Sequence, residues 1–239
     1  MIRSLLSFLP FISRANALET EWAVEDLIEN NYRVSDEIEV ISTYYGGLHG
    51  NQRGAYLDVE ASRHVKPGDF LLLILTASGG YQTVPPDYTP LLTTELKKRR
   101  RNLTIDIAYK KYEEKTSPNT RIFRESDNTF ASLVTLRGAD IIVDAKGFVD
   151  PAGGLRGYAF TPRVQTAEHG CLLTAFFYAE PHKAKIEDQY QLLSFTNKHE
   201  GLAIGISQTS GGLSKRVKAK GREEIKGTGE DLSVAVSLF

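Results

Sequence analysis

Few residues of this sequence have the types and spacing that catalysis or metal binding requires. No two histidines stand in an HExxH or other i, i+4 arrangement. The sequence also has no GxSxG elbow, P-loop or GxGxxG motif, and the glycine-rich stretch at 44–54 lacks the helix and lysine that hold a phosphate. We therefore expect no enzymatic activity, no metal and no cofactor. The five histidines are His49, His64, His169, His182 and His199.

Two basic segments are the clearest local charge features. The segment ELKKRRRN at 95–102 either binds phosphate or an acidic neighbour, or covers a hairpin tip before a strand at Leu103; we favour the hairpin. A second basic segment spans 214–226, where strand alternation would place Arg216, Lys218 and Lys220 on one face, opposite Lys215, Val217 and Ala219. We expect the face with Arg216 to be an assembly interface.

Four tyrosines in expected loops are candidates for receptor binding, because an aromatic ring can stack on a sugar. The alternative is that they close the ends of a sandwich core. They are Tyr44, Tyr45, Tyr81 and Tyr88.

Composition narrows the class of protein. A chain of 239 residues with 41% hydrophobic content can bury a substantial core. The formal net charge of −1 gives no reason to expect nucleic acid or an anionic membrane as the main partner. The single cysteine, Cys171, lies in an apolar run and is expected to be a buried small hydrophobe. No stretch reaches the roughly 18 to 20 apolar residues that span a bilayer.

The N-terminal segment differs from the rest of the chain. Asn16 and Glu19 have the spacing of a capping box, and a short apolar face follows, which predicts a helix over 16–33. We expect residues 1–36 to be a helical arm that anchors the protein to neighbouring subunits; a signal peptide cleaved after Ala17 is the alternative. The anchoring side chains would be Ile2, Leu5, Leu6, Phe8, Leu9 and Phe11.

From residue 37 to 239, short runs rich in β-branched and aromatic residues alternate with turn residues, as in antiparallel β proteins. The first series of expected strands is 37–43, 54–61, 69–77, 103–112, 120–126 and 130–138. The second series is 170–180, 190–196, 201–208, 214–221 and 232–239.

The two series share their order and spacing. The run GDFLLLIL from Gly68 corresponds to the run from Gly170, 102 residues later, and the strands ending at Leu136 and Leu238 have the same offset. Leu91-Leu92 matches Leu192-Leu193 at offset 101, and 103–107 matches 202–206 at offset 99. We infer an internal repeat of 68–138 in 170–239. Neither half can shield both faces of its own sheet, so we expect an all-β fold: a two-sheet antiparallel β-sandwich with jelly-roll-like packing.

The motifs resemble a β-sandwich domain found in bacteriophage tail and other virion structural proteins, and in some secreted bacterial surface proteins. That family has a Gly-Asp-Leu-Leu-Leu-like strand, a Pro-Pro-x-Gly-Trp-Thr-like turn, a strand ending in Arg-Gly-x-Asp, and a second half with a Gly-x-Leu-Leu-like strand. Tyr88 stands where the family tends to have Trp. Here the elements fall on 68–75, 85–89, 136–140, 170–177 and 232–239.

The resemblance implies a scaffold for assembly or adhesion without chemistry of its own. We expect a bacteriophage virion structural protein, a tail or fibre component acting in assembly or host attachment. Its partners would be other virion proteins, copies of itself and a host surface glycan. The open alternatives are a capsid decoration protein and a secreted carbohydrate-binding or adhesion module.

Overall fold

A computed structural model describes residues 23–48, 54–80, 82–98, 101–150, 158–178, 183–196, 200–220 and 231–239. Throughout these ranges the regular elements are strands, numbered β1 to β16, and every strand pair is antiparallel. The all-β class expected from the sequence is therefore confirmed. Among the described residues, no helix is long and apolar enough to cross a membrane.

The first main sheet is built from residues 23–137, in the spatial order β1-β2-β8-β4-β6-β5. Its strands are β1 (Ala23–Arg33), β2 (Glu39–Leu48), β8 (Asn128–Arg137), β4 (Phe70–Ser78), β6 (Arg101–Lys111) and β5 (Thr89–Lys98). Every residue of β4 is buried, because the second main sheet covers one face of the strand and a smaller sheet covers the other. Burial on both faces explains why this strand is a continuous apolar run instead of an alternating one.

The second main sheet is built from residues 142–238, in the order β13-β14-β11-β16-β9. Its strands are β13 (Tyr190–Thr196), β14 (Gly201–Leu213), β11 (Gln165–Tyr178), β16 (Asp231–Leu238) and β9 (Ile142–Asp150). Two small sheets complete the molecule. One pairs β3 (Tyr56–Val59) with β7 (Thr120–Phe123), and the other has the order β10 (Tyr158–Phe160), β15 (Lys218–Lys220), β12 (Lys185–Ile186).

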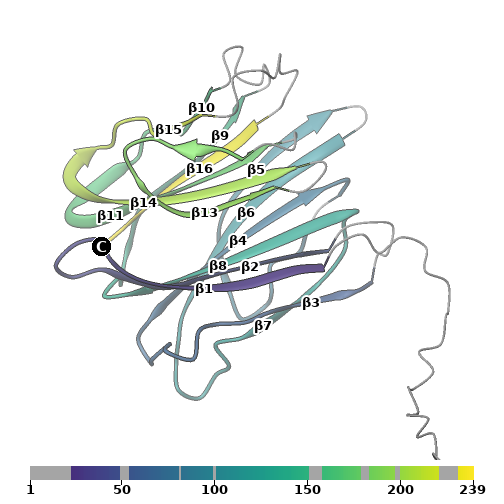
Figure 1. Cartoon of the computed structure of the whole chain (residues 1–239), viewed down its shortest axis with the longest axis horizontal. Coiled ribbons are helices and arrows are strands. Elements are labelled where there is room, and N and C mark those ends of the chain that lie inside the picture. The colour runs from purple at the N-terminus through teal and green to yellow at the C-terminus, as the bar shows by residue number, and fades with distance from the viewer. Residues whose placement is uncertain are drawn as a thin grey trace, which may run out of the picture.

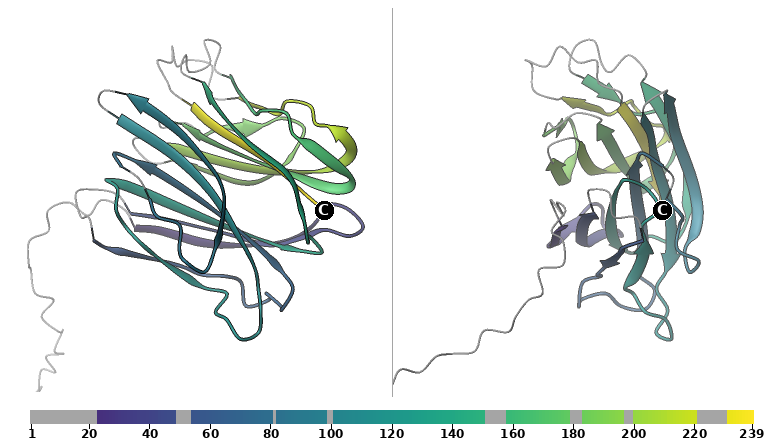
Figure 2. Two further views of the ribbon diagram at one scale, coloured as in Figure 1. Left: turned by 180° about the vertical axis from the view of Figure 1, so that it is seen from behind. Right: turned by 90° about the vertical axis from the view of Figure 1, so that its right-hand side faces the viewer.

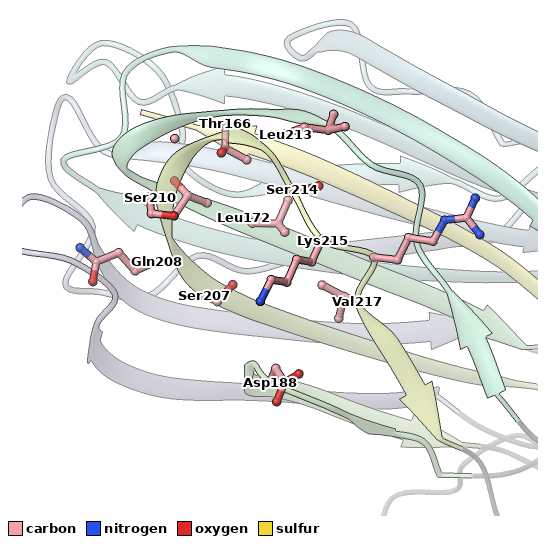
Figure 3. A pocket seen from close by; sticks show the side chains of 13 residues that line it. Thr166, Leu172, Asp188, Ser207, Gln208, Ser210, Leu213, Ser214, Lys215 and Val217 are labelled. Atoms are coloured by element: carbon pink, nitrogen blue, oxygen red, sulfur yellow. The ribbon is translucent and has the colours of Figure 1, made fainter.

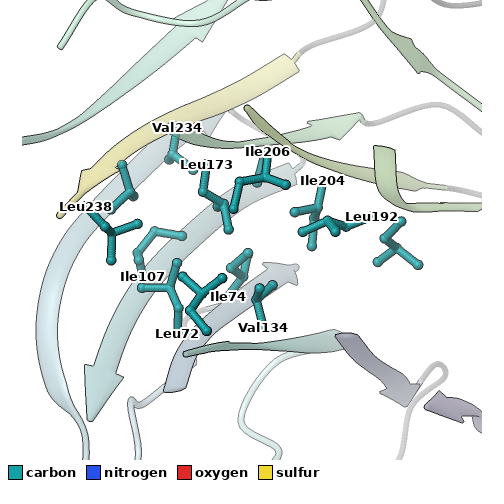
Figure 4. Packing of buried hydrophobic residues seen from close by; sticks show 14 of the residues in the cluster. Leu72, Ile74, Ile107, Val134, Leu173, Leu192, Ile204, Ile206, Val234 and Leu238 are labelled. Atoms are coloured by element: carbon teal, nitrogen blue, oxygen red, sulfur yellow. The ribbon is translucent and has the colours of Figure 1, made fainter. Parts of the chain in front are cut away.

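The central core lies between the two main sheets, whose inner faces meet (Figure 4). Leu72 and Ile74 of β4 belong to the same buried cluster as Leu173 of β11 and Ile204 of β14. Each small sheet covers the outer face of one main sheet and closes a second and a third apolar cluster. The molecule therefore has four layers, with β3–β7 on one outside and β10–β15–β12 on the other (Figures 1 and 2).

The strand pairing supports the internal repeat. The order β2-β8-β4-β6-β5 of the first half recurs as β9-β16-β11-β14-β13 in the second, and β3–β7 recurs as β10–β15. Even the irregularities recur: the register shifts at Ile41 in β2 and at Val143 in β9, each beside the last residues of the neighbouring strand. A second pair of shifts falls at Leu91 in β5 and Leu192 in β13.

The register corrects one detail of the repeat. Phe70 pairs with Leu136, and Cys171 pairs with Leu238, so Cys171 is the counterpart of Phe70, at an offset of 101. An offset of 102 would match Phe70 to Leu172, which belongs to the outer cluster and not to the central one. A slip of one residue turns a side chain to the opposite face of a sheet, and two consecutive apolar runs conceal such a slip.

The helix expected over 16–33 is wrong where the structure describes it. Residues 23–33 form the edge strand β1, which pairs with β2 along its length. Leu27 packs against the outer cluster and Ile28 against the central core, so adjacent apolar residues serve opposite faces of a strand. The expected capping box at Asn16 and Glu19 lies outside the described residues.

Candidate functional site

A hollow of about 300 Å³ opens on the outer side of the second main sheet, beside the small sheet (Figure 3). It lies where the paired strands β11 and β14 extend beyond the part of the fold that the two halves share. β11 begins at Gln165, which pairs with Leu213, whereas the counterpart strand β4 begins only at Phe70. The extension therefore belongs to one half of the molecule.

The walls of the hollow are fixed by backbone conformation and hydrogen bonds. Gly211 and Gly212 have φ values of +81° and +80°, a region that glycine adopts without the strain of a side chain. The chain then returns over the sheet through 214–217, where the Ser214 N–H donates to the Val164 carbonyl (2.8 Å). The Val217 N–H donates to Thr161 Oγ1 at 3.0 Å, which ties the other end of this connection.

The lining of the hollow combines hydroxyl groups, an apolar floor and three charges. Leu172 of β11 lies at its centre, and the Lys215 amine extends towards the side where Ser207 and Asp188 lie (Figure 3). Arg216 also lines it. The full lining is Thr166, Leu172, Asp188, Ser207, Gln208, Thr209, Ser210, Gly211, Leu213, Ser214, Lys215, Arg216 and Val217.

Several lining hydroxyls are occupied in holding the walls. Thr166 Oγ1 donates to the Gly212 carbonyl at 2.9 Å, and Thr209 Oγ1 donates to the Ala167 carbonyl at 2.6 Å. The charged residues are different: within the part of the chain that the structure describes, Asp188, Lys215 and Arg216 make no ion pair. The lining holds neither histidine nor cysteine, so its groups are suited to binding a polar ligand.

The three basic residues expected at an interface lie in and beside this region. Val217 and Ala219 are buried while Lys218 and Lys220 face outward, which confirms the expected alternation for these four residues. Lys218 Nζ lies 3.5 Å from Glu187 and 3.6 Å from the centre of the Tyr158 ring. Lys220 Nζ lies 5.9 Å from the same ring, and Arg216 is exposed at the hollow.

Lys215 is the residue that the sequence pattern misplaced. The expected strand 214–221 would have put it on the buried face with Val217, but β15 begins only at Lys218, and Lys215 is exposed in the connection before it. The sequence signal for this connection was the glycine pair 211–212 within a run of serine and threonine, which favours a bend.

The candidate receptor tyrosines do not come together on the surface. Tyr44 is 3% exposed and donates its hydroxyl to the Asp58 carbonyl at 2.6 Å, and Tyr88 is 4% exposed. Both belong to the outer cluster under β3–β7. Tyr45 lies on the other face of β2, where its half-buried ring contacts Phe195 at 5.3 Å. Tyr81 lies outside the described residues.

Two other sequence features have different outcomes. In the basic segment 95–102, the described residues have the antiparallel pairing that a hairpin requires, with Lys98 of β5 opposite Arg101 of β6. The anchoring side chains lie outside the described residues, and their role stays a prediction; they are Ile2, Leu5, Leu6, Phe8, Leu9 and Phe11.

No protein-family model matches this chain, and no curated protein matches it. The link to virion β-sandwich proteins therefore remains a resemblance carried by the motifs.

Proposed function

We propose that this protein is a structural component of a bacteriophage virion, acting in assembly or host attachment as part of a tail or fibre. The observation that carries the proposal is the strand order of the second half. If β9 to β16 are counted as eight consecutive strands, the main sheet has the order first, eighth, third, sixth, fifth, and the small sheet has the order second, seventh, fourth. Apart from the place of the fifth strand, β13, this order matches that of a jelly roll, a fold that is common in viral capsid and lectin domains.

The way in which the halves combine supports a scaffold role. The inner faces of both main sheets are buried in one shared core, so surfaces that bind partners must lie on the outside of the molecule. The described exterior of the second half offers the hollow and, next to it, the outward face of β15 with Lys218 and Lys220. A rigid β-sandwich that carries additional structure on one side suits a protein that presents that side to a neighbouring subunit or a receptor.

The assembly interface can be tested by charge reversal. Arg216→Glu, Lys218→Glu and Lys220→Glu combined should weaken assembly if an acidic surface of another subunit lies on this face. A control with the same change of charge is Arg63→Glu, Lys66→Glu and Lys115→Glu, three exposed residues of the first half. If the first variant is incorporated into particles as well as the control variant is, this face is not part of the assembly interface.

Quantitative mass spectrometry of purified phage particles tests the function directly. We expect a few to a few tens of copies per particle, the number a tail or fibre requires. Hundreds of copies would indicate the alternative role of capsid decoration. Absence from particles, together with a secreted chain beginning at Leu18, would contradict the proposal and favour a secreted carbohydrate-binding or adhesion module.

That second candidate is favoured by one observation, the hollow itself. A lectin-type module needs a small polar pocket on a rigid β framework, and the hollow has this form.

A further inference from the structure

We propose that the hollow at the β11–β14 extension is a binding site for an acidic sugar, with Lys215 binding the carboxylate and Asp188 accepting hydrogen bonds from sugar hydroxyls. The proposal gives the attachment role suggested above a ligand class, and it rests on that role for its biological meaning. It also moves the expected glycan contact from the tyrosines to the opposite side of the molecule.

The charges around the hollow are the first argument. Elsewhere on the described surface, several neighbouring opposite charges pair closely, as in Lys146–Asp144 at 3.1 Å and Lys97–Glu95 at 2.9 Å. Around the hollow, Lys215, Arg216 and Asp188 make no such contact within the described ranges. Two cations and a carboxylate that line the same hollow complement a ligand that carries both an anion and hydroxyl donors.

The lining is the second argument, and it distinguishes an acidic sugar from inorganic phosphate. A doubly charged anion would be repelled by Asp188 and would gain nothing from the apolar floor at Leu172. A sugar ring has an apolar C–H face, which Leu172 and Val217 can contact, and hydroxyls that both donate and accept. A volume of about 300 Å³ is at the small end of ligand pockets and has room for one sugar residue.

The rigidity of the walls is the third argument. The hydroxyls of Thr166, Thr209 and Ser214 are hydrogen-bonded to the backbone, so the hollow is formed before any ligand arrives. A preformed site avoids the entropy loss of ordering loops on binding. The extension that makes it adds little to the core, because residues 165–169 of β11 are exposed or half-buried.

The test compares two probes that differ at one group, methyl glucuronide and methyl glucoside, by NMR titration of the full chain. We expect the glucuronide to bind with a millimolar or lower Kd and the glucoside at least tenfold more weakly. Lys215→Met should remove this preference, and Asp188→Asn should weaken both sugars. Asn suits the φ of +60° at position 188, so the turn is retained. Lys66→Met, an exposed lysine far along the chain, is the matched control and should bind as the parent protein does.

Three results would overturn the site: no binding of the glucuronide, equal affinity for both sugars, or full affinity in the Lys215→Met protein. Displacement of the glucuronide by equimolar inorganic phosphate would mean a general anion site and would also reject the proposal. The outcome is independent of the particle analysis. A protein that binds glucuronide but is absent from virions would retain the sugar site and lose the virion role.

Discussion

Asp69 and Arg137 belong to two of the motifs on which the family resemblance rests, Gly-Asp at 68–69 and Arg-Gly at 137–138. In the structure these two side chains pair with each other. Asp69 is 3% exposed and receives Arg137 Nε at 3.0 Å and Nη2 at 2.9 Å, together with the Lys66 N–H at 2.8 Å. The side-chain hydrogen bonds with Asp69 raise the pKa of Arg137. Gly138 follows with a φ of +86°, and a side chain there would lie 1.8 Å from the Glu37 carbonyl oxygen. The Gly-Asp and Arg-Gly pairs therefore join the start of β4 to the end of β8.

Replacing Asp69 with Asn should lower the free energy of unfolding by about 1–3 kcal/mol, because a buried charged acceptor is lost. Urea denaturation measures the change. Asp58→Asn is the control, since Asp58 makes a similar two-bond contact with Arg121 on the exposed surface, where such pairs contribute little. Equal effects of the two substitutions would contradict a structural role for the buried pair.

A second buried carboxylate, Asp106 in β6, gives a pH prediction. Burial raises its pKa, the Thr93 hydroxyl opposes the shift by donating at 2.5 Å, and the charge of Glu95 adds to it. The Asp106 carboxyl group therefore binds its proton more tightly in the folded state than in the unfolded state. Ionisation of Asp106 therefore lowers the free energy of unfolding. This loss develops as the pH rises through and above 3.8, the pKa of the carboxyl in the unfolded chain.

Asp106→Asn should remove that loss. The difference in unfolding free energy between the variant and the parent protein should increase in favour of the variant as the pH rises from about 4 towards neutrality. Parallel urea titrations across this range measure it, with Asp58→Asn as a comparison. A difference that stays constant with pH would show that the carboxylate is as well solvated in the folded chain as in the unfolded one.

At the scale of elements, the edges of the two main sheets meet where β9 lies against β5. A Cβ atom at Gly147 of β9 would lie 1.6 Å from Thr94 Oγ1 of β5, so glycine is required for the close approach. Thr94 Oγ1 itself is buried and makes no hydrogen bond with any described residue. The contact is therefore steric, and its partners can be changed separately.

Gly147→Ala should destabilise the protein by about 1–3 kcal/mol through overpacking. Thr94→Ala alone should change stability little, and in the double variant it should recover part of the loss because the clashing hydroxyl is gone. Thermal unfolding of the four proteins gives the coupling energy. Additive effects would mean that β5 and β9 are not in contact in solution.

The elements that the sequence predicted best are the strands with the clearest patterns. Leu103, Ile105 and Ile107 of β6 alternate and face the central core as expected. β1 was misassigned because its many acidic residues and its adjacent Leu27-Ile28 pair also suit an amphipathic helix. The helix and strand propensities of these residues cannot show that apolar clusters lie against both faces of β1.

The candidate site was harder to predict than the fold. Strand alternation correctly turned Lys218 outward, but Lys215 depends on where the chain bends after Gly211-Gly212 and on how far β15 extends. Asp188 comes from a separate turn between β12 and β13, and only the folded chain brings it to the same hollow.

At the scale of the whole molecule, the two halves should unfold together because they share the central core. Cys171 lies in that core, and burial raises its pKa to about 12, so in the folded protein it should react roughly a thousandfold or more slowly with a thiol reagent. Asp69→Asn lies in the other half of the chain, yet it should speed the labelling of Cys171. An unchanged labelling rate in that variant would mean that the halves open independently.

The shared core also has a consequence during synthesis on the ribosome. Residues 1–138 emerge before the second half exists, and the inner face of β4 and β6, with Leu72, Ile74 and Ile107, then has no partner sheet. At about 5 to 20 residues per second, translation of the remaining residues takes roughly 5 to 20 seconds. For that time the apolar inner face of the first sheet is exposed on the nascent chain, and this is the interval in which binding by a chaperone matters most.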